Sequence, residues 1–283
     1  MARAFGLATG HARIIRRFSC IAAALLTVPQ WLRAQAGPPF QTNDPGTPGS
    51  GNWEINLAAA PVFTRGASSW EVPQIDMNFG LGERIQLTFE VPYVIQTGSG
   101  TARATGWSNA FPGIKWRFLD QGEDGWQASV FPQLETRGSA QAEREQIVGP
   151  ATRVLLPVEV THKLGPLDVD MEVGVYAPKN GVQEHIVGLV AGRSISDRLD
   201  MAFELFNDHA SGAPPNQTTL DFGGRYKFSD AFIGLFMAGR SVSGTAEGQP
   251  EFFGYLGVQI LLTDYGRHLQ AGKQSIHDIA QHQ

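Results

Sequence analysis

Acidic side chains recur at every second position over one short stretch of the chain, at Asp168, Asp170 and Glu172. On a β-strand, such residues point to one face, and three carboxylates on that face supply the oxygen ligands that a hard cation prefers. Pairing with basic residues of neighbouring strands is the more common arrangement. We therefore predict ion pairs, with Arg153 or Lys163 before the stretch and Arg193 after it, and no metal site or cofactor.

Nucleophilic catalysis requires a serine or cysteine beside a base. The histidines that follow residue 36 fall at expected strand ends, in loops or in the tail: His162, His185, His209, His268, His277 and His282. The run Gly239 to Gly244 contains serines but has neither the spacing of a nucleophile elbow nor a following helix. We therefore predict no catalytic residues. The alternative to a protein without catalytic residues is an enzyme of the lipid-hydrolase type, built on the outer-membrane barrel that the patterns below predict.

The elements that carry these residues are predicted from a period of two. From Ile85 to Ile95, apolar residues alternate with mostly polar ones, and from Leu167 to Tyr176 they alternate with the acids described above. A helix would scatter those acids around its circumference. The same pattern predicts twelve strands, near 52–63, 70–80, 85–95, 107–119, 126–137, 152–162, 167–176, 185–194, 199–208, 218–228, 231–240 and 252–261.

The strand lengths and connections indicate a membrane barrel. Most of the predicted strands have about ten residues, the length that a tilted strand needs to cross a bilayer. Short turns, as at Leu81–Arg84 and Ser229–Asp230, alternate with longer polar links, as at Gln96–Gly106 and Gly138–Ala151. Short turns on one side and longer loops on the other are typical of up-and-down outer-membrane barrels. Aromatic residues border several connections, as interfacial girdles would: Phe63, Trp70, Phe118, Trp126, Phe228 and Phe232.

The fold class that follows is all-β, an up-and-down antiparallel transmembrane β-barrel of about twelve strands. Because unpaired backbone groups cost several kcal/mol in hydrocarbon, such a sheet must close on itself. Apolar residues would then face lipid and polar residues the lumen. A soluble periplasmic barrel that binds an apolar ligand has the same period with the faces exchanged, and it is the other alternative.

The first 36 residues are typical of an export signal. Arginines precede the apolar stretch Ile21–Val28, and Ala34–Ala36 matches a small-residue cleavage site. Removing this leader takes five arginines from the 22 Lys and Arg, leaving 17 against 27 Asp and Glu, a net charge of −10. It also removes Cys20, the single cysteine. An acidic chain without a basic stripe argues against a nucleic-acid partner.

The segment after the leader reads Gly37-Pro38-Pro39-Phe40-Gln41-Thr42-Asn43-Asp44-Pro45, followed by Gly51-Asn52-Trp53-Glu54. This opening resembles that of the family of outer-membrane proteins of the meta-pathway of phenol degradation. The resemblance implies a transporter-like barrel and the uptake of aromatic compounds. From the residues, Phe40–Ser50 is rich in turns; we predict a periplasmic linker, with a partial plug of the lumen as the alternative.

The predicted organisation is a signal peptide (1–36), a periplasmic lead segment (37–51), an outer-membrane barrel (52–262) and a C-terminal tail (263–283). The predicted function is passive passage of small, aromatic or hydrophobic solutes through a barrel that contacts outer-membrane lipid. The candidate lumen-lining residues are the charged ones on the inward face: Glu90, Lys115, Arg117, Glu135, Asp168, Asp170, Glu172, Arg193, Glu204, Arg225 and Lys227.

Overall fold

The computed structural model describes residues 36–98, 103–122, 124–145, 147, 152–177, 184–210, 216–243 and 250–263. The predicted leader before Ala36 and the predicted tail after Thr263 lie outside the described residues. The strands are β1 (Trp53–Thr64), β2 (Ala67–Gly80), β3 (Ile85–Gly98), β4 (Ala104–Trp107), β5 (Phe111–Asp120), β6 (Gln127–Val130), β7 (Gln133–Glu135), β8 (Arg153–Leu164), β9 (Leu167–Ala177), β10 (Glu184–Ser196), β11 (Leu199–Ala210), β12 (Asn216–Lys227), β13 (Phe232–Ser243) and β14 (Phe252–Leu262).

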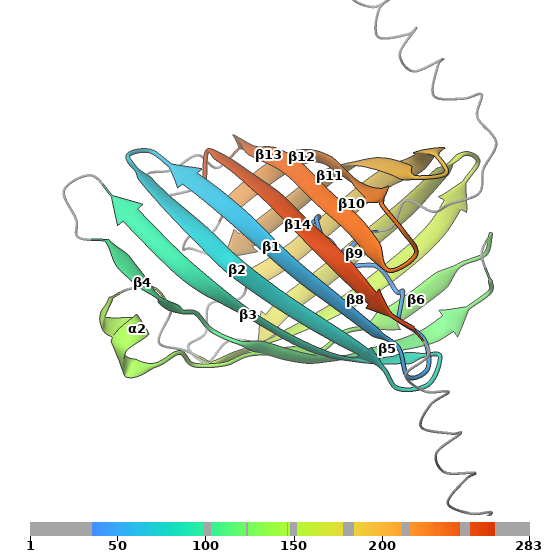
Figure 1. Cartoon of the computed structure of the whole chain (residues 1–283), viewed down its shortest axis with the longest axis horizontal. Helices are drawn as coiled ribbons and strands as arrows, with labels where there is room; N and C mark the ends of the chain where they lie inside the picture. The colour runs from blue at the N-terminus through green and yellow to red at the C-terminus, as the bar shows by residue number, and fades with distance from the viewer. Residues whose placement is uncertain are drawn as a thin grey trace, which may run out of the picture.

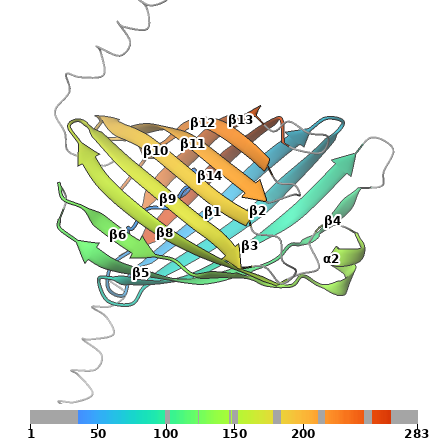
Figure 2. The same cartoon turned by 180° about the vertical axis from the view of Figure 1, so that it is seen from behind.

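These fourteen segments form the twelve strands of the barrel, each of which is called a wall below. β4 and β5 both pair with β3, and β6 and β7 both pair with β5 and β8, so each of these two pairs is one interrupted wall. All neighbours are antiparallel, and β1 pairs with β14 from Trp53↔Leu262 to Phe63↔Phe252, which closes the sheet (Figures 1 and 2). The predicted twelve-stranded, up-and-down barrel is confirmed.

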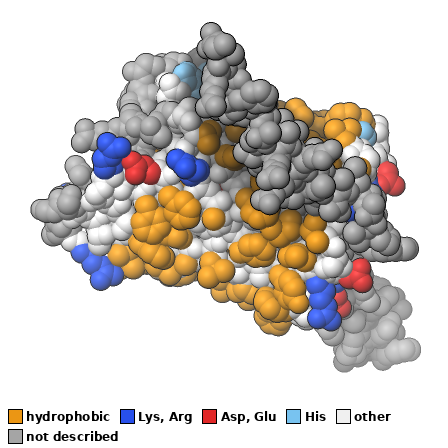
Figure 3. Space-filling view, turned by 90° about the horizontal axis from the view of Figure 1, so that it is seen from above, with side chains coloured by type: hydrophobic (Ala, Val, Ile, Leu, Met, Phe, Trp, Pro, Cys, Tyr) orange, Lys and Arg blue, Asp and Glu red, His pale blue; other side chains and the backbone are white. Residues whose placement is uncertain are grey.

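The apolar residues of the alternation lie on the outer surface. Phe89 is 41% exposed and Val173 is 52% exposed, although a soluble barrel would bury such side chains in its interior. The neighbours of Val173 in sequence are buried, with Glu172 only 1% exposed. In the space-filling view, apolar side chains spread across the middle of the visible face, and charged side chains lie toward its two ends (Figure 3). The apolar face therefore points outward, as in a membrane barrel, and not inward, as in a soluble barrel.

One end of the barrel carries short connections and is called the turn end below; the other is the loop end. The turn end has the connections at 81–84, 121–126, 165–166, 197–198 and 228–231. Phe118, Trp126, Phe228 and Phe232 are all exposed beside these turns, as expected for an interfacial girdle. β1 begins and β14 finishes at the turn end.

The first connection at the loop end differs from the prediction. We expected a longer loop between Phe63 and Trp70, but β1 and β2 continue to Thr64 and Ala67 and leave only Arg65 and Gly66 between them. Gly66 has a positive φ of 81°, which a tight hairpin turn requires and glycine adopts readily. Trp70 pairs with Pro61 and its ring meets that of Phe63 edge-on at 5.9 Å, so the aromatic residues lie within the wall.

A single described helix, α2 (Ala140–Arg144), lies in the connection between β7 and β8. Its Ala142 and the following Ile147 pack on Val94 of β3. The loop therefore folds against the loop end of the lumen wall. None of the described helical residues forms a segment long and apolar enough to span a bilayer.

Candidate functional site: a plugged lumen

The lead segment enters the barrel. Residues 36–47, called the plug below, lie among inward-facing side chains of the wall, where Phe40 is 7% exposed and Thr42 is fully buried. Gly37 N donates to Thr42 O at 2.7 Å, so residues 37–42, called the tip below, fold back on themselves. This placement corrects the linker prediction for these residues: the alternative, a partial plug, is the arrangement in the structure.

Irregular backbone inside a barrel must find hydrogen-bond acceptors for its N–H groups. The tip finds them at Glu204 of β11, a completely buried carboxylate. Gln41 N donates to its Oε2 at 3.1 Å and Thr42 N donates to its Oε1 at 2.6 Å. One ionisable side chain thus holds two consecutive peptide groups, with hydrogen bonds of the stronger, charge-assisted type when the group is ionised.

Two acids of β9 act in the same way. Asn43 N donates to Glu172 Oε2 at 2.7 Å, and Ala36 N donates to Asp170 Oδ2 at 3.0 Å. The prediction that this acidic ladder pairs across strands with Arg153, Lys163 or Arg193 is therefore wrong for these two carboxylates. Their partners are peptide groups from a segment about 130 residues earlier in the chain.

Two basic residues hold the plug from other walls. Arg225 of β12 donates to Ala36 O and Pro38 O, both at 2.8 Å from Nη2. Lys115 of β5 donates to Asp44 O and forms an ion pair with Glu159 at 3.2 Å. The plug is consequently held through its carbonyl oxygens as well as its N–H groups.

The plug also has an apolar anchor. Phe40 packs with Val190, Ala202, Met237 and Phe253 in a buried cluster inside the lumen. Close to it, a Cβ added to Gly188 of β10 would lie 2.0 Å from Thr42 Oγ1, which is closer than non-bonded atoms approach. The absence of a side chain at residue 188 therefore makes room for the tip.

The plug joins the wall at the turn end. Gly51 N donates to Gly80 O at 2.9 Å, and Gly80 N donates to Asn52 O at 3.0 Å. A Cβ on Gly80 would lie 1.7 Å from Gly49 O, so the backbone of the lead crosses this position in direct contact with β2. Glycine at residue 80 permits that crossing.

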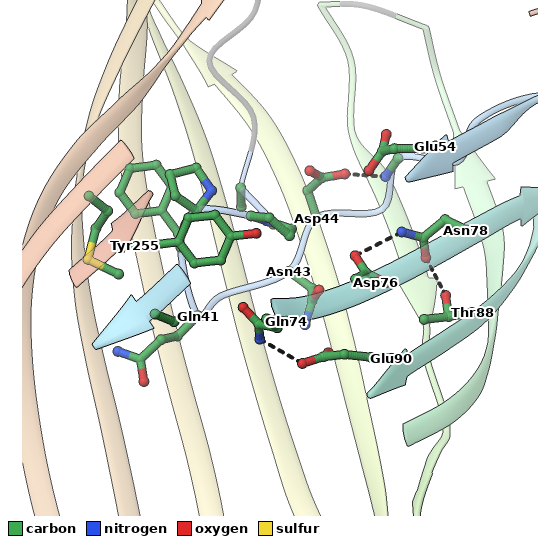
Figure 4. A pocket seen from close by; sticks show the side chains of 18 of the residues that line it. Gln41, Asn43, Asp44, Glu54, Gln74, Asp76, Asn78, Thr88, Glu90 and Tyr255 are labelled. Atoms are coloured by element: carbon green, nitrogen blue, oxygen red, sulfur yellow. Dashed lines mark hydrogen bonds between the residues drawn. The ribbon is translucent and has the colours of Figure 1, made fainter. Parts of the chain in front are cut away.

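The plug leaves part of the lumen open. A cavity of about 440 Å³ remains between the plug and the side of the barrel that β1, β2 and β3 form (Figure 4). Its acidic lining residues are Asp44 of the plug and Glu54, Glu71, Asp76 and Glu90 of these strands. Hydrogen bonds join Glu90 to Gln74 and Asp76 to Asn78 along this wall, with N···O distances of 2.8 and 3.0 Å.

The predicted lumen-lining residues separate into four groups. Around the plug and cavity the structure places Glu90, Lys115, Asp168, Asp170, Glu172, Glu204 and Arg225. At the rim of the turn end, Arg117 donates to Glu83 O and pairs with Asp120, and Lys227 pairs with Asp230. Glu135 lies toward the loop end, beside Arg153. Arg193 belongs by register to the outer face.

Arg193 is a correction to the prediction. It lies opposite Met201 in the register of β10 with β11, and Met201 alternates with the inward-facing Ala202. Its side chain belongs by register to the outer face, although it is only 5% exposed and its Nε donates to Ser194 O at 3.4 Å. The pattern around Arg193 contains Gly192 and Ser194, small residues that left the inward face ambiguous.

Arg153 organises a second charged group toward the loop end. Its guanidinium pairs with Glu135 at 2.7 Å and with Glu184 at 2.6 Å, and it lies 4.2 Å from the centre of the Tyr176 ring. Asn109 donates to Glu135 as well. This network joins β7, β8 and β10, so it stabilises the barrel toward the loop end.

Sequence reasoning missed the polar side chains that accompany the acids on β1–β3. On the lumen face, hydrogen bonds join Asp76 with Asn56, Asn78, Gln86 and Thr88, and Gln74 donates to Glu90 separately. Their signal was present, because they occupy the same alternate positions as Asp76 and Glu90. A selection by charge alone does not include them.

The alternative of a hydrolase finds no catalytic arrangement in the described part of the chain. His209 Nδ1 lies 3.0 Å from Asn216 Oδ1, and no serine–histidine hydrogen bond occurs among the described residues. The same residues contain no group of three or more His, Cys, Asp and Glu side chains placed to hold a metal ion. His268, His277 and His282 lie outside the described residues.

Comparison with known proteins identifies the fold. No protein-family model matches the sequence, and no curated protein matches it. Among solved structures, a COG4313 outer membrane channel from Pseudomonas putida F1 is similar with a TM-score of 0.55 at 13% identity, covering 81% of this chain and 100% of that one. The KdgM and NanC porins are similar at TM-scores of 0.50 and 0.51, each at 9% identity over 73% of this chain and 98% of theirs. The chain therefore has the fold of outer-membrane β-barrels.

Proposed function

We propose that this protein is an outer-membrane channel through which small solutes pass by diffusion, in a lumen narrowed by the plug. The observation that carries the proposal is the combination of an apolar outer face with a charged lumen that still contains a cavity of about 440 Å³. A purely structural barrel gains nothing from leaving such a space. A similar fold in a protein described as an outer membrane channel supports the same function.

The route to the membrane is part of the proposal. Residues 1–36 act as the leader and are cleaved, which removes Ala36 with its contacts to Asp170 and Arg225 and leaves residues 37–47 as the plug. The barrel then assembles in the outer membrane with its turn end in the periplasm. The even number of walls supports this orientation, because both ends of the described barrel lie at the turn end. No reaction is assigned, since passage needs only a path lined by groups that replace water.

The class of solute follows from the resemblance and the lining together. The opening motif resembles the family of the meta-pathway of phenol degradation, which implies aromatic compounds. The cavity offers aromatic and apolar surface at Phe40, Phe131, Phe253 and Tyr255 beside its acids and amides. Small solutes with an aromatic or apolar body and a polar group fit this mixed lining.

Planar bilayers test the function. Refolded protein, checked by heat-modifiable migration on a denaturing gel, is expected to produce discrete conductance steps in KCl that the refolding buffer does not produce. Fractionation of cells that express the full chain should place it in the outer membrane. Folded protein that never raises the conductance or the solute flux would refute the channel.

A further inference from the structure

The cavity beside the plug has an acidic side that the plug does not neutralise. Glu54, Glu71, Asp76 and Glu90 all line it from β1, β2 and β3. Among the described residues, none of these four carboxylates forms an ion pair. Four neighbouring acids without a bound cation are unfavourable in a space shielded from bulk water.

The nearby cations are engaged elsewhere. Lys115 forms its ion pair with Glu159 and donates to Asp44 O, and Arg225 donates to the carbonyl groups of the plug. The acids receive hydrogen bonds mainly from amide side chains, which donate without carrying charge. Lys115 and Arg225 also line this cavity, and a ligand that carries a positive charge would add to what they supply.

Among the acids of this cavity, Asp76 has one oxygen atom without a hydrogen-bond partner in the described part of the chain. Asp76 is only 8% exposed, and its Oδ2 accepts from Asn56 at 2.9 Å and from Asn78 at 3.0 Å. Its Oδ1 is inaccessible to solvent and has no hydrogen-bond partner among the described residues. Leaving a buried carboxylate oxygen without a partner is costly, and Asp76 lines the cavity, close to Glu90 and Gln74 (Figure 4).

Another part of the cavity lining is apolar and aromatic. Phe40 of the plug, Met237, Phe253 and Tyr255 all line it, and they pack in one cluster. Aromatic rings beside acids favour a cation that has a hydrophobic body, because the rings attract positive charge and bury apolar surface together.

We propose that the cavity binds a small organic cation, with its ammonium group at Asp76 and Glu90 and its apolar or aromatic body against Phe253 and Tyr255. This inference rests on the proposed channel function and gives it a substrate class, amine-bearing aromatic or alkyl solutes. A bare metal ion fits less well, because the described acids are not grouped closely enough to supply three or more ligands to one ion.

Equilibrium binding tests the site without requiring transport. The folded protein in detergent is titrated with 2-phenylethylammonium chloride by calorimetry, and in parallel with 2-phenylethanol, which has the same body but no charge. We expect the ammonium compound to bind with a Kd of about 1 mM or below and at least about tenfold more tightly than the alcohol.

A pair of double variants locates the site. Asp76→Asn with Glu90→Gln keeps the side-chain shapes and removes two charges from the cavity, and it should weaken binding of the ammonium compound at least about tenfold. Asp197→Asn with Asp230→Asn removes the same charge from exposed turns and should leave the Kd unchanged. Heat-modifiable migration confirms that each variant is folded.

The outcomes separate this inference from the channel function. No binding, equal binding of the amine and the alcohol, or equal loss in both double variants would overturn the cation site. Conductance is recorded independently on the same preparations. A protein that conducts but does not discriminate the amine retains the proposed function, whereas one that binds the amine but never conducts retains the site alone.

Discussion

The plugged and open sides of the lumen have similar side chains but different partners. On β9 and β11, Glu172 and Glu204 accept hydrogen bonds from the backbone of plug residues 41–43. On β2 and β3, Asp76 and Glu90 accept from neighbouring amide side chains and face a cavity. The comparison shows that a row of inward acids can serve either to hold a segment of the chain or to line a path, and that the partner decides which.

Removing the plug should have the largest effect on this difference. Deletion of residues 37–47 leaves both sides of the lumen open, so we expect a several-fold increase in single-channel conductance. The barrel itself should remain folded, because its closure depends on the pairing of β1 with β14. An unchanged conductance in the folded deletion variant would show that the plug does not narrow the path.

A side chain at Gly188 should displace the tip of the plug without changing any charge. Gly188→Val places its Cβ only 2.0 Å from the present position of Thr42 Oγ1. We expect a conductance increase smaller than that of the deletion, measured in the same bilayers. The control is Ala191→Val, which adds two methyl groups on the opposite face of the same strand and should leave the conductance as it is.

Neutralising one acid on each side tests the comparison directly. Glu204→Gln keeps the volume but loses the charge that strengthens two hydrogen bonds to the tip, which should weaken docking of the plug by about 1–2 kcal/mol, or about 5–30-fold in the open fraction. Glu90→Gln on the open side touches no plug N–H and should leave that fraction unchanged. The open probability of single channels provides the measurement. Equal effects of the two substitutions would contradict the assignment of two different roles.

The smallest effect is expected at the loop that packs on β3. Outside the strands, Arg137 donates to Glu143 at 2.8 Å, and this contact lowers the pKa of Glu143 below its usual value near 4.5. Because the folded-state pKa is depressed, the contact stabilises the loop at pH values above the unfolded pKa and is lost as the pH falls through the folded value. Arg137→Gln should return the midpoint of Glu143, followed by NMR, to about 4.5 with little change in conductance. A midpoint that does not rise in the variant would refute the pairing.

The barrel could be predicted because its information is local. Alternation at Ile85–Ile95 and Leu167–Tyr176 assigns a face to each residue, and the backbone geometry of a strand then fixes the rest. Interruptions of the alternation, as at Phe131 and Pro132 between β6 and β7, changed the number of segments but not the number of walls.

The plug could not be predicted with the same tools. Phe40–Asp44 has no period, and its turn-rich composition fits a linker as well as a buried segment. Its burial depends on hydrogen bonds to Glu172 and Glu204, which lie far away in the sequence. The same distance explains why the sequence predicted ion pairs between the acidic ladder and basic residues on adjacent strands. Rules for cross-strand pairs do not consider a backbone segment that enters the lumen from a distant part of the chain.

The contact of Gly49 with Gly80 has a consequence for kinetics. The lead is covalently continuous with β1, and this contact holds it in place at the turn end, so a displaced tip remains a tethered ligand at an effective concentration on the order of millimolar. Dilution of the protein does not separate the tip from the barrel, and rebinding of the tip is a unimolecular event. Any solute that occupies the space left by the tip must therefore compete with a segment that stays attached to the barrel. The duration of an open event would then report how long that solute stays bound.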